Sequence, residues 1–253
     1  MEMNNENKNT IPGLDKILRA IEERKTFARM SRYRYTGSNY NIEDALKIVE
    51  AIGKTRDRKF VIDSENRFAY ENFIKWCHCD ESMKQIHPDT GAIVPGNLYA
   101  GIYIGGTTGS GKSWCLEIMR AYASALGFKI TFPATFEKDD TRPLAWRIVR
   151  ADEICEMFAE DGKITELKKS QIIAIQDFGQ EQEESLYMGN RVDVVRQLIE
   201  YRGDIDNELT LITSNLPMGS DRLVSRYGDR VASRLRQMCN NLVIKGKDRR
   251  VIY

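Results

Sequence analysis

The most constraining feature of the sequence is the run Gly106-Thr-Thr-Gly-Ser-Gly-Lys112-Ser113, which fits the pattern G-x-x-x-x-G-K-[ST]. The residues before it, Leu98 to Ile104, form an apolar run with β-branched and aromatic members, as expected of a buried strand. The residues after it are apolar at helical spacing up to Gly127, which is positioned to end a helix. A glycine-rich turn between a strand and a helix is the context that this pattern needs, and we interpret it as a P-loop.

In a P-loop each residue type has a physical role. Glycines let the backbone turn sharply, so that several N–H groups point at one phosphate, and the helix that follows adds its partial positive charge. Lys112 would bring a full charge to the β- and γ-phosphates, and the Ser113 hydroxyl would be a ligand of Mg2+. ATP is the expected nucleotide, because the chain has no N-K-x-D tetrad for reading guanine. The predicted nucleotide-binding residues are Gly106, Thr107, Thr108, Gly109, Ser110, Gly111, Lys112 and Ser113.

Composition limits the class of protein. The 253 residues are enough for one α/β core of about 150 to 170 residues and a smaller appendage. The formal net charge of +1 indicates no partner by itself. No apolar run approaches the ~18 residues of a membrane span, and the N-terminus does not resemble a signal peptide. The five scattered cysteines suit reduced thiols, so we expect a cytoplasmic protein.

Two further strands are predicted to end in polar residues. The apolar run from Gln171 ends in Asp177, which has the form of a Walker B element whose acid lies beside Mg2+. The run Leu209 to Thr213 is followed by Ser214 and Asn215, and Asn215 at that edge can reach the γ-phosphate or the attacking water. An asparagine that only satisfies its own turn is the alternative. Strands are also expected at 128–132 and 146–149, of which only one needs to belong to the core.

The N-terminal part carries weaker signals. The segment from Arg24 to Tyr35 is basic with interleaved aromatic residues, a mixture that suits phosphate contact and base stacking. A solvated arm or a protein-docking segment has the same composition. Helices are expected at 41–53 and 67–79, with a short strand at 60–62. Cys77 and Cys79, with the two histidines of the chain nearby, lack the spacing of a zinc knuckle.

The C-terminal segment is basic. Nine Lys and Arg residues against three Asp residues between 221 and 253 leave a local charge of +6. The basic residues are Arg222, Arg226, Arg230, Arg234, Arg236, Lys245, Lys247, Arg249 and Arg250.

The order of these elements resembles an AAA+ ATPase: a strand, a P-loop, an acid-ended strand, a Ser-Asn-ended strand and a basic helix. The runs 194–202, 211–217, 225–235 and 245–250 are similar to DnaC-type helicase loaders and the related IstB transposition ATPases. The resemblance covers roughly residues 95 to 250. It implies an α/β P-loop NTPase fold of AAA+ type, with a parallel sheet flanked by helices and no C-terminal helical lid. We therefore expect a small, mainly helical, partner-binding N-terminal region (1–95) and an ATPase core (96–253).

The resemblance also implies roles for single residues. Asn215 looks like the sensor-1 residue. The stretch Arg230-Val-Ala-Ser-Arg234 is similar to box VII, which supplies an arginine finger to a neighbouring subunit. Arg234 is the first choice for this finger and Arg230 the second, because a guanidinium stabilises the charge that spreads over the γ-oxygens. A solvated helix face is the alternative interpretation of these arginines.

One departure from the family concerns the Walker B element. Two acids normally precede the apolar residue and glycine, whereas this chain has Gln176-Asp177-Phe178-Gly179. In one alignment Gln176 replaces the acid that orders Mg2+, and Asp177 is the catalytic base. In the other, Asp177 serves the metal and an acid such as Glu181 replaces the base. A neutral amide is a poorer partner for Mg2+ than a carboxylate, so we expect slow hydrolysis.

The resemblance implies a function as well. It predicts an ATP-hydrolysing replication protein that self-associates into an AAA+ oligomer or spiral and loads a hexameric replicative helicase onto single-stranded DNA. The alternative is an IstB-like or TnsC-like DNA-binding ATPase that regulates transposition. A nucleotide-binding interaction module without real ATPase activity is a third reading, motivated by Gln176.

Overall fold

A five-stranded parallel sheet forms the centre of the computed structural model, which describes residues 14–23, 31–33, 40–132, 140–205, 208–246 and 248–249. The strand order is β12-β4-β11-β8-β7, and all neighbours run parallel. The strands are β4 (Gly101–Gly106), β7 (Arg147–Arg150), β8 (Ile172–Phe178), β11 (Leu209–Ser214) and β12 (Cys239–Ile244). Because the strands are parallel, their carboxyl ends meet at one edge of the sheet, where ligands bind in such folds.

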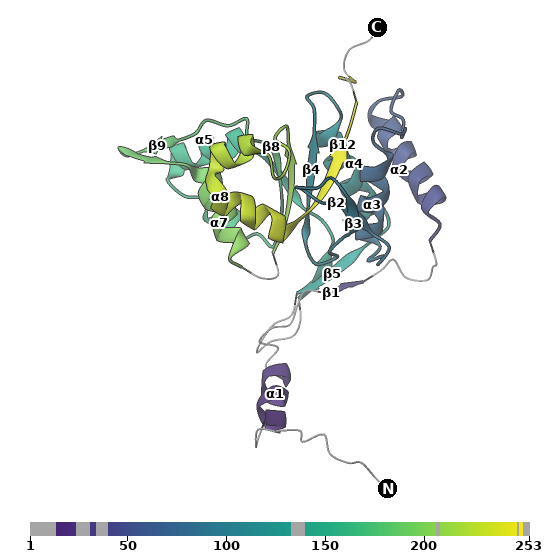
Figure 1. Cartoon of the computed structure of the whole chain (residues 1–253), viewed down its shortest axis with the longest axis horizontal. Helices are drawn as coiled ribbons and strands as arrows, with labels where there is room; N and C mark the ends of the chain where they lie inside the picture. Colours follow the sequence, from purple (N-terminus) through teal and green to yellow (C-terminus); the bar gives the residue numbers. More distant parts are fainter. Residues whose placement is uncertain are drawn as a thin grey trace.

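Helices cover both faces of the sheet (Figure 1). Successive strand residues face opposite sides, so Ile102 and Ile104 join one buried cluster and Tyr103 joins the other. The first cluster holds α2 (Ile42–Arg56), α3 (Arg67–Cys77) and α4 (Lys112–Ala125). The second holds α5 (Ala151–Asp161), α6 (Thr165–Lys169), α7 (Val194–Gly203) and α8 (Asp221–Met238). The predicted parallel α/β sheet flanked by helices is confirmed.

The sequence left open which of the runs 128–132 and 146–149 belongs to the core sheet, and the strand pairing decides this. β7, from the predicted run 146–149, pairs with β8 at the edge of the central sheet. The run 128–132 becomes β5 (Lys129–Phe132), which pairs antiparallel with β1 (Ser31–Tyr33) and β6 (Asp140–Pro143) in a separate sheet. Two hairpins complete the described strands: β2 (Lys84–Ile86) with β3 (Ile93–Pro95), and β9 (Ser185–Tyr187) with β10 (Asn190–Val192).

The helices of the N-terminal region pack into the same core as the sheet. Val49 of α2 and Trp76 of α3 are fully buried in the cluster that contains α4 and Ile102. The boundary between residues 95 and 96 stays a prediction. The first described element, α1 (Leu14–Glu23), lies apart from the sheet in Figure 1. Most of the basic-aromatic segment 24–35, and the N-terminal ten residues, lie outside the described residues.

The strand predicted at 60–62 is wrong. Residues 57–66 form an irregular segment with turns, in which several backbone groups bond within the segment or to side chains. Phe60 N–H donates to the Asp57 carbonyl, Ile62 N–H to the Glu50 carboxylate, and the Asn66 amide to the Val61 carbonyl. These bonds satisfy the backbone without a partner strand, and they fix the segment as one wall of the pocket described below.

Cys77 and His78, two of the residues weighed for zinc, are part of the core. Cys77 and His78 are buried, and His78 Nε2 lies 2.8 Å from the Tyr122 hydroxyl. The His78 ring also stacks on Tyr40 with centroids 3.7 Å apart. Over the ranges that the structure describes, no three His, Cys, Asp or Glu side chains are grouped to hold a metal ion. In the same ranges, no helix combines the length and apolar character that a membrane span needs.

Candidate nucleotide-binding site

The P-loop connects the end of β4 to the start of α4. Gly109 (φ +74°) and Gly111 (φ +99°) both adopt left-handed backbone conformations, which explains glycine at these two positions. Gly111 is the N-cap of α4, so the positive end of the helix faces the turn. The buried Ser110 hydroxyl has no hydrogen-bond partner among the described residues. A backbone cradle with an unsatisfied buried donor is an arrangement suited to an anion.

Lys112 joins the P-loop to the neighbouring strand. Its side chain is buried, and Nζ donates to the Thr107 carbonyl at 2.7 Å and to Asn215 Oδ1 at 2.6 Å. Asn215 reaches this position because β11 lies directly beside β4. The structure thus brings Asn215 to the P-loop, which is about 100 positions away in the sequence and was predicted separately.

A bulge in β8 directs Asp177 away from the sheet. The register with β11 moves from Ile212 opposite Ile175 to Ser214 opposite Phe178, so β8 contains one extra residue. Asp177 has φ +57°, a left-handed conformation that Asp adopts more readily than most residues. Its N–H donates to Thr213 Oγ1 at 3.2 Å, which holds the bulge against β11. Bulges beside functional sites commonly redirect one side chain, and this one turns Asp177 toward the P-loop.

Gln176, the residue before the bulge, faces α4. Its Nε2 donates to Glu117 Oε1 over 3.4 Å, and the Glu117 carboxylate also pairs with Arg56 of α2. Neither Gln176 nor Glu117 lines the pocket. Asp177 lies 3.1 Å from Arg150 Nη1 and keeps about a third of its side chain exposed. The two candidate Walker B residues therefore occupy different places, with only Asp177 at the pocket.

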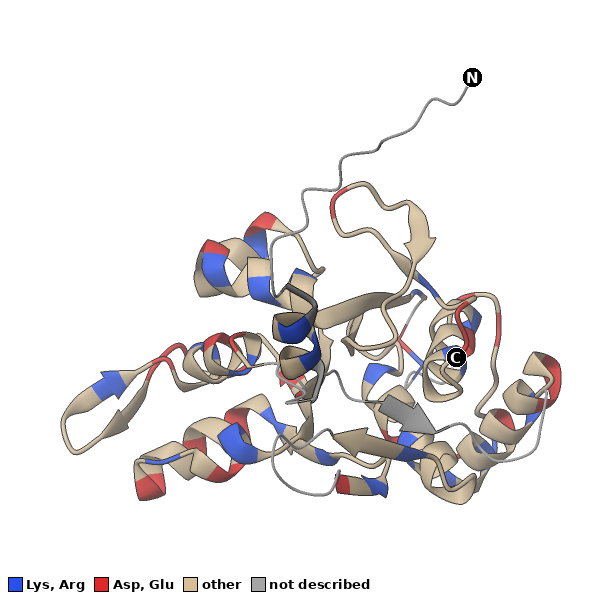
Figure 2. Ribbon diagram, turned by 90° about the horizontal axis from the view of Figure 1, so that it is seen from below, with Lys and Arg blue, Asp and Glu red and all other residues tan. Residues whose placement is uncertain are grey.

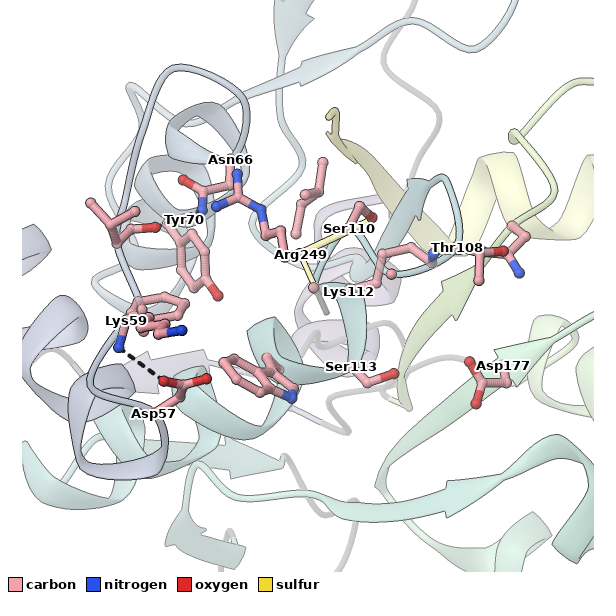
Figure 3. A pocket seen from close by; sticks show the side chains of 17 residues that line it. Asp57, Lys59, Asn66, Tyr70, Thr108, Ser110, Lys112, Ser113, Asp177 and Arg249 are labelled. Carbon is pink, nitrogen blue, oxygen red and sulfur yellow. Dashed lines mark hydrogen bonds between the residues drawn. The ribbon is translucent and has the colours of Figure 1, made fainter. Parts of the chain in front are cut away.

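The pocket has a volume of about 560 Å³, which is in the range of small-molecule sites. One side consists of P-loop residues 108–113 together with Asp177 and Asn215. In Figure 3 the Ser113 side chain points toward the Asp177 carboxylate, so two oxygen donors of the kind that Mg2+ prefers lie together. Apolar residues line the rest of the pocket: Phe60, Val61 and Tyr70 from the N-terminal region, Trp114 of α4 and Ile244 of β12. A nucleotide requires a pocket with one end that binds its phosphate anions and another end that is apolar and accepts its base.

The sequence did not predict two parts of this pocket. The wall from Asp57 to Tyr70 belongs to the region that was assigned to partner binding, and Phe60 was taken for a strand residue. Arg249 also lines the pocket, although the sequence indicated it only as a member of the basic C-terminal segment and of a run in the family resemblance. Both parts come from segments that no local pattern connects to the P-loop, since they are about 50 and 140 residues away in the chain.

Glu181 does not fit the role of a replacement base. It is buried outside the pocket, where it accepts from Gly179 N–H at 2.9 Å and pairs with Arg226 at 3.1 Å. The Tyr227 hydroxyl donates to the same carboxylate. Burial raises the pKa of Tyr227 above its ordinary value, so this hydroxyl stays protonated as a donor. Glu181 is therefore held in a structural network that joins α8 to the loop after β8.

Arg230 and Arg234 lie on α8, away from the pocket of their own chain. Both pair with Asp204, the residue that follows α7, and the Arg230 contact measures 3.2 Å. In a single chain these arginines do not line the pocket.

The basic C-terminal segment is largely matched by acids from elsewhere in the chain. Lys and Arg are interspersed with Asp and Glu along the helices in Figure 2. The pairs are Arg226 with Glu181 and Asp193, Arg230 and Arg234 with Asp204, Arg236 with Asp89, and Arg249 with Asp63 and Glu65. The local charge of +6 counted along the sequence is thus reduced by tertiary contacts, and it does not by itself describe a nucleic-acid surface.

Comparison with known proteins gave structural neighbours only. No family model matches the chain, and no curated protein sequence matches it. A DnaC helicase loader structure aligns with 76% of this chain and 95% of its own, at 17% identity and a TM-score of 0.43. Domain III of Thermotoga maritima DnaA covers 75% of this chain and 65% of its own, at 20% identity and a TM-score of 0.45. AMPPCP-bound DnaA from Aquifex aeolicus covers 74% and 48%, at 17% identity and a TM-score of 0.39. The chain spans less than two thirds of both DnaA chains.

We predict that Lys112→Ala weakens ATP binding by roughly 10- to 100-fold, because hydrogen bonds to a charged group contribute about 1.5 to 3 kcal/mol. Isothermal titration with ATP and Mg2+ measures the change. Lys169→Ala, at an exposed lysine that ends α6, is the matched control and should bind as the wild type does. Equal affinity in the wild type and Lys112→Ala would contradict a nucleotide site at this P-loop.

Proposed function

We propose that the chain binds and hydrolyses ATP with Mg2+ as a subunit of an AAA+ assembly that loads a replicative helicase onto single-stranded DNA. The observation that carries the ATPase part is the convergence of Lys112, Ser113, Asp177 and Asn215 on one pocket from the ends of three adjacent strands. The sequence resemblance to DnaC-type loaders supports the helicase and the DNA as partners. The resemblance also supports the oligomer.

Most residues of the pocket would bind the nucleotide and its metal ion, and Asn215 would orient the triphosphate. The P-loop amides and Lys112 would hold the triphosphate, while Ser113 and Asp177 would hold Mg2+. When bound, Mg2+ neutralises charge that develops on the phosphate oxygens. Asn215, already bonded to Lys112, is placed to orient the end of the triphosphate.

The geometry favours Asp177 as the metal-binding acid and leaves the base position without a carboxylate. Asp57 and Asp177 are the acids that line the described pocket, and Asp57 lies on the opposite wall beside Lys59 (Figure 3). Gln176 faces α4 and Glu181 is held by Arg226. Among the acids that line the described pocket, only Asp177 therefore lies on the P-loop side, which supports the expectation of slow hydrolysis.

We predict that Gln176→Glu alone does not restore fast hydrolysis. The new carboxylate would meet Glu117 in a buried place, and like charges at that distance raise the pKa of one of them. The double variant Gln176→Glu with Glu117→Gln removes this conflict, but residue 176 faces α4 and does not line the pocket, so this variant should also hydrolyse ATP at the wild-type rate. Single-turnover assays at saturating ATP measure it. A double variant clearly faster than the wild type would contradict this assignment, because it would show that residue 176 limits turnover.

We predict that Arg234→Ala keeps the ATP affinity of the wild type but loses the hydrolysis that depends on assembly. Arginine fingers contribute about 10³ to 10⁵ in rate, and the guanidinium would come from a neighbouring chain. Turnover is measured against protein concentration with single-stranded DNA present. Arg222→Ala, at an exposed arginine of the same helix, is the control. A loss of ATP affinity that accounts for the whole loss of rate would contradict action in trans.

Helicase loading is tested by gel filtration of the full chain with a hexameric replicative helicase, with ATP, with ADP and without nucleotide. We expect a complex that depends on ATP and that places the helicase on a single-stranded oligonucleotide. Failure to bind the helicase in every nucleotide state would contradict the loader function. A preference for duplex DNA, with ATP-dependent filaments, would instead favour the transposition regulator.

A further inference from the structure

The segment after β12 crosses the P-loop. We call residues 245–249 the strap, of which residue 247 lies outside the described residues. Two of its backbone groups bond the P-loop: the Gly246 carbonyl accepts from Thr107 Oγ1 at 2.8 Å, and Arg249 N–H donates to the Gly109 carbonyl at 3.0 Å. On its other side, Lys245 N–H donates to the Glu65 carbonyl at 3.0 Å. The strap therefore joins the P-loop to the turn that precedes α3.

The strap fits closely between its two neighbours. A methyl group added at Gly109 would overlap the Asp248 carboxylate, and one added at Gly246 would overlap the Glu65 carboxylate. Gly246 also has φ +105°, a conformation that other residues rarely adopt. Both glycines thus allow the strap to lie directly against the phosphate loop and the turn.

The strap places Arg249 in the pocket. Figure 3 shows its side chain near Ser110 and Asn66, between the P-loop and the wall from the N-terminal region. The Arg249 Nη2 atom lies 2.9 Å from Asp63 Oδ1 and 3.5 Å from Glu65 Oε2. The hydrogen bond from Arg249 holds the pKa of Asp63 below its ordinary value, so the pair remains ionised at neutral pH.

The contacts of Arg249 leave part of its guanidinium unused. Both ion pairs employ Nη2, and Nε and Nη1 have no acceptor among the described residues. The side chain keeps 29% of its surface exposed at the pocket. A guanidinium always carries its charge and matches phosphate oxygens geometrically, and here its carboxylate partners fix its position beside a predicted phosphate site.

We propose that Arg249 binds the phosphates of the nucleotide held in its own chain, as a second positive charge beside Lys112. This proposal rests on the nucleotide-binding part of the proposed function. It differs from the arginine-finger role of Arg234, which acts on a neighbouring chain. It also gives the strap a function: the carboxylates of the 63–65 turn position Arg249, so that bound phosphate joins the strap, the turn and the P-loop.

A purely structural Arg249, which only ties the strap to the turn, is the competing explanation. Arg249→Gln and Arg249→Lys separate the two, with Arg236→Gln as the matched control. Arg236 also pairs with an exposed Asp on a turn, but it does not line the pocket. The affinities for ATP and for adenosine, which lacks phosphate, are measured by titration on the full chain, together with the melting temperature of the nucleotide-free protein.

We expect Arg249→Gln to weaken ATP binding by about tenfold and to leave adenosine binding unchanged, since the lost contact is charge-assisted. Arg249→Lys should fall between Arg249→Gln and the wild type, and Arg236→Gln should bind as the wild type does. Unchanged ATP affinity in Arg249→Gln, or an equal loss for ATP and adenosine, would overturn the proposal. If Lys112→Ala loses ATP and Arg249→Gln does not, only this inference fails; a wild type that does not bind ATP removes the proposed function as well.

Discussion

The buried charge of Lys112 is the interaction on which the site depends. Lys112 is only 6% exposed, and the charge of a buried ammonium group has to be compensated by hydrogen-bond acceptors. Here the Thr107 carbonyl and Asn215 Oδ1 are two of these acceptors. Neither of these two acceptors carries a formal charge, and the lysine ammonium lies at the carboxyl edge of the sheet. The amides of the P-loop and the N-terminus of α4 add partial positive charge there. An anion at this edge would satisfy all of these groups at once, and the parallel strands bring Asp177 beside them.

Local patterns were sufficient to predict the P-loop, the acid-ended strand and the Ser-Asn-ended strand, because each depends on a short run with its own chemistry. The bulge was not predictable in this way, since it depends on how Thr213 holds the Asp177 backbone. The strand at 60–62 was wrong for a similar reason: bonds to Glu50, Asp57 and Asn66 replace a partner strand. Contacts between distant segments, rather than local preference, decide these cases.

The charge of the C-terminal segment also differs between the sequence and the folded chain, because it depends on contacts with distant segments. Counted along the chain, the C-terminal segment is strongly basic. In the folded chain, acids from distant segments face most of these arginines, and Asp204 alone accepts both Arg230 and Arg234. The proposed functions of Arg234 and Arg249 therefore differ in kind. Arg249 already lies at its own pocket, whereas Arg234 would have to exchange Asp204 for a phosphate group of another chain.

The central claim is that one nucleotide contacts three distant segments: the P-loop, the turns from Asp57 to Asn66, and the strap with Arg249. Hydrogen–deuterium exchange of the full chain, with and without ATP and Mg2+, tests it most directly. We predict that bound ATP slows exchange in all three segments together, at residues 106–113, 57–66 and 244–249. Unchanged exchange in the P-loop, or protection of the P-loop without the other two segments, would contradict this account of the site.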